Sequence, residues 1–133
     1  MFFRKKNEKI GKLGEKLAVK YLKQKKYKIV ETNFQNCKGI QLGEIDIIAK
    51  EKNNHGVWEI VFVEVKSRMA NTSDIQPESS INWRKLQKLQ KISQIYIDKN
   101  DLWNYEYRFD AIAILFSGNL KILEIKHIKN IYL

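Results

Sequence analysis

The sequence predicts an α/β fold in which helices cover a central mixed β-sheet, with the element order αβββαββ. Two stretches, one near the N-terminus and one after residue 80, carry apolar residues at helical spacing. Runs rich in β-branched and aromatic residues stand between and after them and predict strands. Helices separated by strand runs are typical of a sheet with helices on its faces, which gives three αβα layers.

The first helix is expected from Glu8 to Lys26. Its apolar residues form one stripe, and most of its other residues are lysines. Glu15 is the exception, an acidic residue at the border of the apolar stripe. Such a glutamate either pairs with a lysine one turn away or reaches towards a metal site.

Three strands are expected next. Tyr27–Asn33 alternates enough for the first, and Asn36–Gly39 is a loop. Leu42–Ala49 and Val57–Lys66 form a hairpin around the polar turn Lys52–Gly56.

Charged side chains converge on this hairpin. If it is centred on His55, paired residue numbers sum to 110, so Asp46 lies opposite Glu64, and Lys66 leaves the same face as Glu64. Two carboxylates placed together repel, and burying them without a partner is costly. A divalent cation removes both penalties, and carboxylate oxygens suit Mg²⁺. Lys66 could then hold a water or hydroxide for attack, so phosphodiester hydrolysis is the hypothesis.

The alternative is a solvent-facing ion pair, which is what a Glu and a Lys two residues apart on a strand most often form. Here, however, Glu64 and Lys66 end a face that begins with Trp58, Ile60 and Phe62. A solvated face would be polar throughout. The pattern therefore favours a functional site.

The second half of the chain begins with an expected loop at residues 69–80, which holds the only proline, Pro77. A helix follows from Ile81 to Asp98. Lys85 shares the apolar face of this helix, so its side chain either snorkels to water or binds phosphate.

The last two strands are expected at Tyr105–Phe116 and Leu120–Lys126, joined by a tight turn at Ser117–Asn119. In the first of them, Arg108 and Asp110 point to the same side.

Length and composition limit the class of protein. The 133 residues fit a single domain, 1–133, and the net charge of +10 implies a polyanionic partner unless it reflects genome base composition. One cysteine, Cys37, excludes an intrachain disulfide and fits a reducing compartment. No run is long enough for a transmembrane helix, so a cytoplasmic protein is expected.

Several motifs together resemble the YraN family of small bacterial proteins. That family is similar to archaeal Holliday-junction resolvases and belongs to the restriction-endonuclease-like PD-(D/E)xK superfamily. The matching blocks run over nearly the whole chain: Gly14-Glu15 with Ala18 and Tyr21-Leu22, Gly43–Ala49, Phe62–Arg68, Lys85, and Arg108-Phe109-Asp110. Ile45 stands where the superfamily often has proline before the aspartate.

The resemblance implies a restriction-endonuclease-like three-layer core and metal-dependent cleavage of DNA, with Mg²⁺ or Mn²⁺ as cofactor. It implies that Asp46, Glu64 and the Val65 carbonyl bind metal. Lys66 would be the catalytic lysine, and Glu15 a helix carboxylate that binds metal directly or through water. Arg68 and Lys85 would contact phosphate.

The substrate is expected to be DNA, branched or otherwise structured. Resolvase-like enzymes are two-fold dimers because a junction needs paired cuts, so a homodimer is included in the expectation. A DNA-binding protein that keeps the scaffold without turnover is the alternative. Membrane association through the lysine-rich first helix is disfavoured, because packing on a sheet explains its apolar stripe better.

Overall fold

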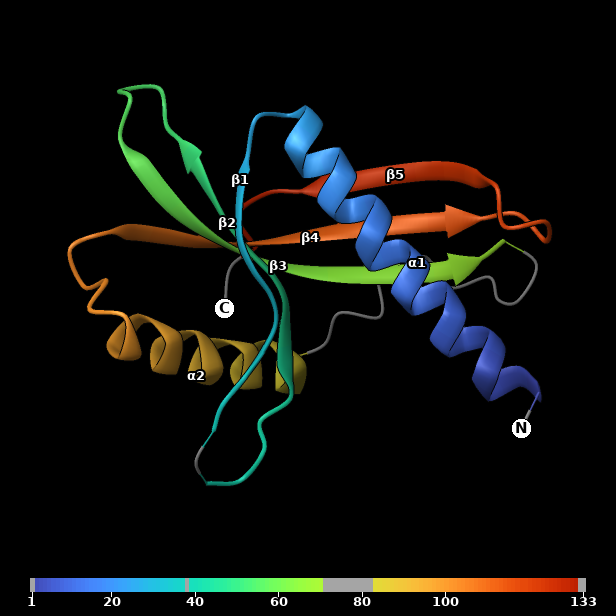
Figure 1. The fold of residues 1–133 in the computed structure, drawn as a ribbon, viewed down its shortest axis with the longest axis horizontal. Coiled ribbons are helices and arrows are strands. Elements are labelled where there is room, and N and C mark those ends of the chain that lie inside the picture. Colours follow the sequence, from blue (N-terminus) through green and yellow to red (C-terminus); the bar gives the residue numbers. More distant parts are fainter. Residues whose placement is uncertain (1, 38, 71–82, 132–133) are drawn as a thin grey trace.

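The computed structural model describes residues 2–37, 39–70 and 83–131, and its element order is the predicted αβββαββ (Figure 1). One sheet holds the strands in the order β1-β2-β3-β4-β5, antiparallel except for the parallel pair β3 and β4. The predicted α/β class with a mixed sheet is confirmed. The elements are α1 Phe2–Gln24, β1 Lys28–Gln35, β2 Glu44–Lys52, β3 Trp58–Met69, α2 Trp83–Lys99, β4 Glu106–Phe116 and β5 Ile122–Ile128.

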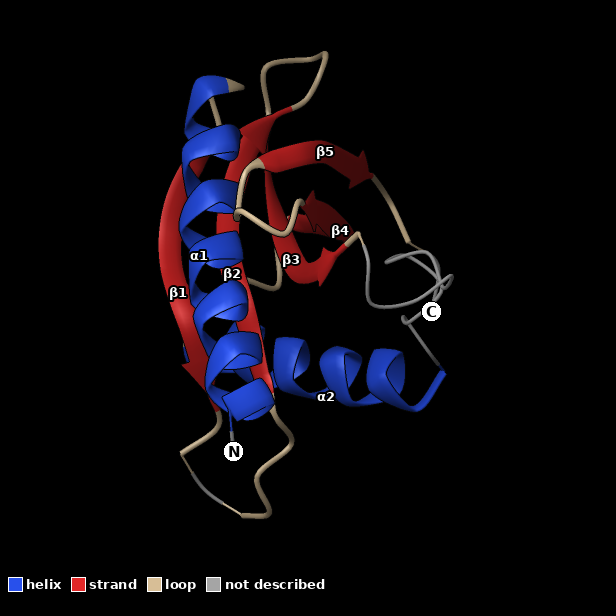
Figure 2. Cartoon of the chain, turned by 90° about the vertical axis from the view of Figure 1, so that its right-hand side faces the viewer, coloured by secondary structure: helices blue, strands red, loops and turns tan. Residues whose placement is uncertain are grey.

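Each face of the sheet is covered by one helix (Figure 2). Along β3, Val61 and Val63 join the core cluster under α1, whereas Ile60 and Phe62 join the cluster under α2. Side chains alternate along a strand, so a strand buried on both sides must be apolar at nearly every position. The run from Ile60 to Val63 meets this requirement and forms the centre of an αβα core.

The β2–β3 hairpin has the register that the sequence predicts. Paired residues run from Lys52 opposite Trp58 to Ile47 opposite Val63, and each pair sums to 110. At the turn, the Asn53 side chain accepts hydrogen bonds from the amides of His55 and Val57 at 2.9 and 3.0 Å. A turn closed in this way holds the register that positions the charged residues further along both strands.

The C-terminal end of α1 is closed by a Schellman-type turn. The Tyr27 amide donates to the Leu22 carbonyl at 2.9 Å, and the Lys26 amide donates to the Lys23 carbonyl at 3.0 Å. Lys26 occupies the left-handed position of this motif, with φ of 70°. The chain therefore turns directly from α1 into β1.

The prediction that the first helix begins at Glu8 is wrong, because α1 begins at Phe2. Residues 2–7 contain no glycine or proline, so nothing local stops the helix from extending. The other bounds differ from prediction by up to three residues. Of the loop expected at 69–80, Met69 belongs to β3 and Ala70 to a turn, and residues 71–80 lie outside the described part of the chain.

Gly14 allows α1 to approach β3 closely. A Cβ atom at this position would lie 1.8 Å from Oγ and 3.1 Å from Cβ of Ser67. Both distances are too short for a normal contact, so a larger residue would push the helix off the sheet. Because Glu15 follows directly, this contact also fixes how far the Glu15 side chain stands from the strands.

A buried polar network joins the first half of β4 to β5 and to the segment that follows β5. Asp110, fully buried, accepts hydrogen bonds from Arg108 Nε at 3.0 Å and from the Asn130 amide at 3.0 Å, and lies 2.8 Å from His127 Nε2. Arg108 also reaches Glu59. Burial alone would raise the pKa of Asp110, but the hydrogen bonds from His127, Arg108 and Asn130 outweigh it and hold that pKa below its ordinary value.

Within the described ranges, neither helix has the length and apolar character needed to cross a bilayer.

The Gly14 contact can be tested by a double-mutant cycle. Gly14→Ala is expected to lower the free energy of unfolding by about 1 kcal/mol, because overpacking against Ser67 exceeds the helix-propensity gain. In a Ser67→Gly background the same change should become neutral or stabilising. Urea unfolding of the four proteins measures the coupling. Gly11→Ala, where an added Cβ meets nothing within 4 Å, is the control and should stabilise; an equal gain from Gly14→Ala would contradict the close approach.

The Asp110 network predicts a defined acid sensitivity. A carboxyl whose pKa is lowered by folding stabilises the protein above its unfolded-state pKa of about 4, and this stabilisation is lost as the pH falls through the folded-state pKa. Asp110→Asn should therefore cost about 2–3 kcal/mol at neutral pH and flatten the dependence of stability on pH in the acid range. Urea unfolding between neutral and acid pH measures both effects.

Glu124→Gln is the matched control, because Glu124 and Lys126 form an exposed pair at 4.0 Å. Its stability should match that of the native protein at neutral pH. If Asp110→Asn also left the stability unchanged, the network would not be what holds β4 and β5 together.

Candidate functional site

The candidate site lies where β2 and β3 part. Their register ends at Ile47 opposite Val63, and beyond it the two strands run in different directions (Figure 1). Asp46 Oδ2 accepts a hydrogen bond from the Val65 amide at 2.8 Å. The carboxylate therefore joins the strands where their main-chain pairing has ended.

The start of β2 is also twisted. Ile47 packs in the cluster under α1, but Ile45 packs in the cluster under α2. Regular alternation would place both side chains on one face, so β2 turns over at Asp46, which lies between them. This twist brings the acidic residues of β2 within reach of both helices.

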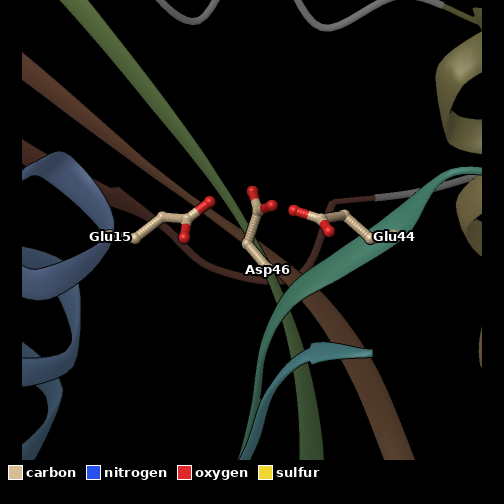
Figure 3. A group of neighbouring side chains, drawn as sticks. All are labelled: Glu15, Glu44 and Asp46. Carbon is tan, nitrogen blue, oxygen red and sulfur yellow. The ribbon is translucent and has the colours of Figure 1, made fainter. Parts of the chain in front are cut away.

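Three carboxylates from different parts of the chain meet there. Glu15 of α1, Glu44 and Asp46 of β2 each offer one oxygen atom, and these atoms lie within 4.8 Å of one another (Figure 3). We call these three residues the acidic cluster. Asn33 Nδ2 donates to Glu15 Oε2 at 3.1 Å and to Glu44 Oε1 at 3.0 Å. The amide of one β1 residue thus holds two of the three carboxylates, and the oxygen set is of the kind that a hard divalent cation prefers.

The surroundings of Asp46 disfavour the charged form of its carboxyl group. Burial raises its pKa most, the charge of Glu64 raises it further, and Glu15 and Glu44 add smaller contributions. The hydrogen bond from Val65 opposes these effects, and the pKa rises to about 8. Asp46 therefore holds a proton at neutral pH unless a positive charge takes its place.

Glu64 lies beside Asp46 and interacts with two lysines. Its Oε1 atom is 2.5 Å from Lys85 Nζ of α2 and 4.0 Å from Lys66 Nζ. Burial alone would lower the pKa of Lys85, but the hydrogen bond and charge of Glu64 contribute to raising it overall. The sequence left snorkelling and phosphate binding open for Lys85; in the structure its ammonium reaches into the site and pairs with Glu64.

Lys66 is the one lysine of the site whose pKa falls. Burial lowers it most, and the hydrogen bond and charge of Lys85 lower it further. The charges of Glu64 and Asp46 oppose this change, and the pKa settles at about 8. A lysine in this state exists partly as the neutral amine near neutral pH, so it can accept as well as donate a proton.

Two hollows meet at Glu44. One, of about 620 Å³, lies beside α1 and is lined by Lys12 and Lys16. The other, of about 430 Å³, lies beside α2 and is lined by Lys88 and Glu64. The acidic cluster therefore has basic side chains on both sides.

The predicted convergence on the hairpin agrees with the geometry. The charge of Glu64 acts on the pKa of both Asp46 and Lys66, and its carboxylate lies 4.0 Å from the Lys66 ammonium. Glu15 also reaches this place, where Asn33 donates to its carboxylate, and its predicted binding of a metal stays a prediction.

The sequence also predicts roles for Val65 and Arg68, both on β3. Val65 contacts Asp46 through its amide, and its carbonyl stays a predicted ligand. Arg68 lies on β3 one step beyond Lys66 on the same strand face and is half-buried, so its role with phosphate also stays a prediction.

The sequence reasoning missed Glu44 and Asn33. A signal for Glu44 was available, because it stands two residues before Asp46 on one strand and alternation tends to place both on one side. Asn33 gave no such signal. Its position depends on the pairing of Thr32 with Ile47 and of Phe34 with Ile45, and on a left-handed φ of 54° that asparagine tolerates well.

Comparison with known proteins finds a family match over most of the chain. The model of the uncharacterised protein family UPF0102 matches residues 14–114. A UPF0102 protein of Caldanaerobacter subterraneus is 41% identical over 124 residues, covering 92% of this chain and 93% of that protein. UPF0102 proteins of Clostridium botulinum and Clostridium acetobutylicum are 42% and 39% identical, over 127 and 126 residues, and each match covers 95% of both chains.

Replacing Asp46 in the acidic cluster by an uncharged residue of the same shape is predicted to stabilise the protein. In EDTA at neutral pH, Asp46→Asn should raise the free energy of unfolding by about 1 kcal/mol. The carboxyl is ionised in the unfolded chain and must take up a proton on folding, whereas an amide needs none and its oxygen can still accept from Val65. Urea unfolding measures the change. Glu124→Gln, the exposed control, should change nothing; a clear loss of stability in Asp46→Asn would mean that the carboxylate is a structural group.

Proposed function

This chain belongs to the UPF0102 family, the YraN family that its motifs resemble, and we propose from the geometry of its acidic cluster that it is a metal-dependent DNA endonuclease. The observation that carries the proposal is the meeting of Glu15, Glu44 and Asp46 beside Lys66. A carboxyl group with a raised pKa, here Asp46, next to a lysine with a lowered one, here Lys66, is typical of catalytic sites.

The donor set fits Mg²⁺ or Mn²⁺. Three carboxylate oxygens lie within 4.8 Å of one another, and two of their residues line hollows: Glu15 and Glu44 the one beside α1, and Glu44 also the one beside α2. The hollows leave room for water and phosphate oxygens around a cation. The raised pKa of Asp46 indicates that a positive charge beside its carboxylate would be favourable. A bound cation would supply charge stabilisation for a pentavalent phosphate.

Glu64 is proposed as a further ligand whose availability Lys85 controls. In the structure its carboxylate is paired with the Lys85 ammonium. A phosphate entering the hollow beside α2 would attract Lys85, as a phosphate-binding role for this residue requires, and Glu64 would then be free to face the cation.

Lys66 is proposed to position or activate the attacking water. Its pKa of about 8 gives it both an ammonium form, which donates to a developing negative charge, and an amine form, which takes a proton from water. Because Lys66 is held between Glu64 and Lys85, its amine is fixed rather than free on the surface.

DNA is the proposed substrate, because the basic residues beside the site suit a phosphate backbone. Lys12 and Lys16 stand one helical turn apart on one side of Glu44, and Lys88 stands on the other. Contacts of this kind hold a strand without reading its sequence, which fits a preference for branched or structured DNA. A homodimer would present two such sites for paired cuts.

The second candidate is a DNA-binding protein without turnover. It is favoured by the Lys85–Glu64 pair, which occupies a carboxylate that a nuclease needs for metal. The two candidates differ in whether a divalent metal binds and phosphodiester bonds break.

The test is a metal-by-substrate panel. The purified protein is incubated with a four-way junction, a flap and a linear duplex in Mg²⁺, Mn²⁺ or EDTA, and nicking is followed on denaturing gels. Cleavage is expected with either metal and not in EDTA. Lys66→Ala should reduce the rate about 100-fold or more, with DNA affinity within a few-fold of native, because the residue acts on the reaction rather than on backbone binding.

Asp46→Ala should abolish cleavage and also Mn²⁺ binding by calorimetry, while Lys121→Ala, an exposed lysine of the β4–β5 turn, should leave both unchanged. Intact substrate in every metal, with DNA still bound, would establish the non-catalytic alternative. A large loss of affinity in Lys66→Ala would place that residue in the basic surface instead.

A further inference from the structure

A second surface lies at the other end of β3 from the acidic cluster. Trp58 begins β3, and Glu64 follows six residues later, a separation of about 20 Å along an extended strand. This end of the sheet plays no part in the site described above.

Two registered rows cross the sheet here on the face that α2 covers further along. In one row Lys50 of β2 pairs with Ile60 of β3, which pairs with Tyr107 of β4. In the next row Lys52 pairs with Trp58. Tyr105 directly precedes β4 and continues that second row. We call the surface made by these side chains the aromatic rows: Lys50, Lys52, Trp58, Tyr105 and Tyr107.

The rings of these rows are open to solvent. Trp58, Tyr105 and Tyr107 are 37%, 41% and 43% exposed. Trp58 and Tyr105 line one hollow of about 770 Å³ between the β2–β3 turn and the start of β4. Large rings that line a hollow rather than pack into a core are available to a flat ligand.

Two lysines already lie over these rings. Lys50 Nζ is 5.5 Å from the centre of the Tyr105 ring, and Lys52 Nζ is 5.2 Å from the Trp58 ring. Exposed cation–π contacts of this kind are weak, so the ammonium groups can move to a stronger acceptor and leave the ring faces free.

Charge at this end of the sheet is divided between the two faces. Glu51, Glu59 and Glu106 form a row on the opposite face, where Arg108 binds the first two. Glu106 also lines the hollow at its edge. The face with the aromatic rows presents lysines, so it complements a ligand that combines flat rings with negative charge.

We propose that the aromatic rows bind single-stranded nucleic acid, with bases stacked on Trp58 and Tyr105 and with Lys50 and Lys52 on the phosphates. Every base has a π-face, so stacking on these rings requires no particular sequence. The bases of a duplex are already stacked on each other, so the surface should prefer single strands. The inference is independent of the proposed endonuclease activity, because it rests on residues remote from the acidic cluster.

The test uses Trp58 as its own probe. The full chain carries three tryptophans, and in a Trp83→Phe, Trp103→Phe variant Trp58 is the only one left. This variant is titrated with a dT oligonucleotide in EDTA, where metal-dependent cleavage is absent. Quenching of Trp58 fluorescence is expected, because stacking on a base quenches indole emission, and a duplex of equal length should quench much less.

The contributions of single residues are measured by anisotropy of a labelled oligonucleotide, in otherwise native protein. Trp58→Ala and Tyr105→Ala should each weaken binding about tenfold, as expected for loss of a stacked base. Lys50→Gln with Lys52→Gln should reduce the dependence of affinity on salt, because fewer counterions are released.

Matched controls separate this surface from the rest of the protein. Trp103→Ala removes an exposed ring held by Asp98 outside the rows, and it should leave affinity unchanged. Oligonucleotide binding without Trp58 quenching, or equal losses in Trp58→Ala and Trp103→Ala, would overturn the proposal. So would the absence of binding, which would leave the rows as a surface for a protein partner.

Discussion

The position of the candidate site depends on one hydrogen bond, from the Val65 amide to the Asp46 carboxylate. It forms where β2 and β3 stop pairing and begin to diverge. With it, a carboxylate is held at the fork between two strands, and the twist of β2 presents that fork to α1 on one side and α2 on the other. Glu15 of α1 meets Asp46 there, and Lys85 of α2 pairs with the neighbouring Glu64.

Two buried aspartates show how the same residue type takes opposite roles in one sheet. Asp110 is surrounded by donors, and its pKa is lowered; Asp46 is surrounded by acids, and its pKa is raised. The first arrangement stabilises the fold at neutral pH, since every neighbour favours the charged form. The second opposes folding unless a cation is supplied. An uncompensated buried carboxyl does not stabilise the fold, so its presence at Asp46 supports the proposal of a functional site there.

The sequence predicts what depends on alternation and turn chemistry. The order of elements, the hairpin register and the shared face of Glu64 and Lys66 follow from these two rules, and the structure has all three. What it does not predict depends on twist and on side-chain conformation. Asn33 meets the acidic cluster because its neighbours pair with β2 on either side of Asp46 and its own backbone is left-handed. The pairing of Lys85 with Glu64 depends on how α2 crosses the sheet. Neither contact produces a repeating pattern in the sequence from which it could be predicted.

The two surfaces at the ends of β3 are connected by α2. This helix covers the same sheet face between them, and its exposed side carries Arg84, Lys88 and Lys91. Its buried side supplies Leu89 and Ile92 to the core, so the division of the helix into apolar and basic sides follows from ordinary amphipathic packing. A polyanion bound at either surface therefore lies next to a basic helix that leads to the other. Backbone contacts of this kind carry no sequence information, so in the proposed function such a path would favour strand geometry over base sequence.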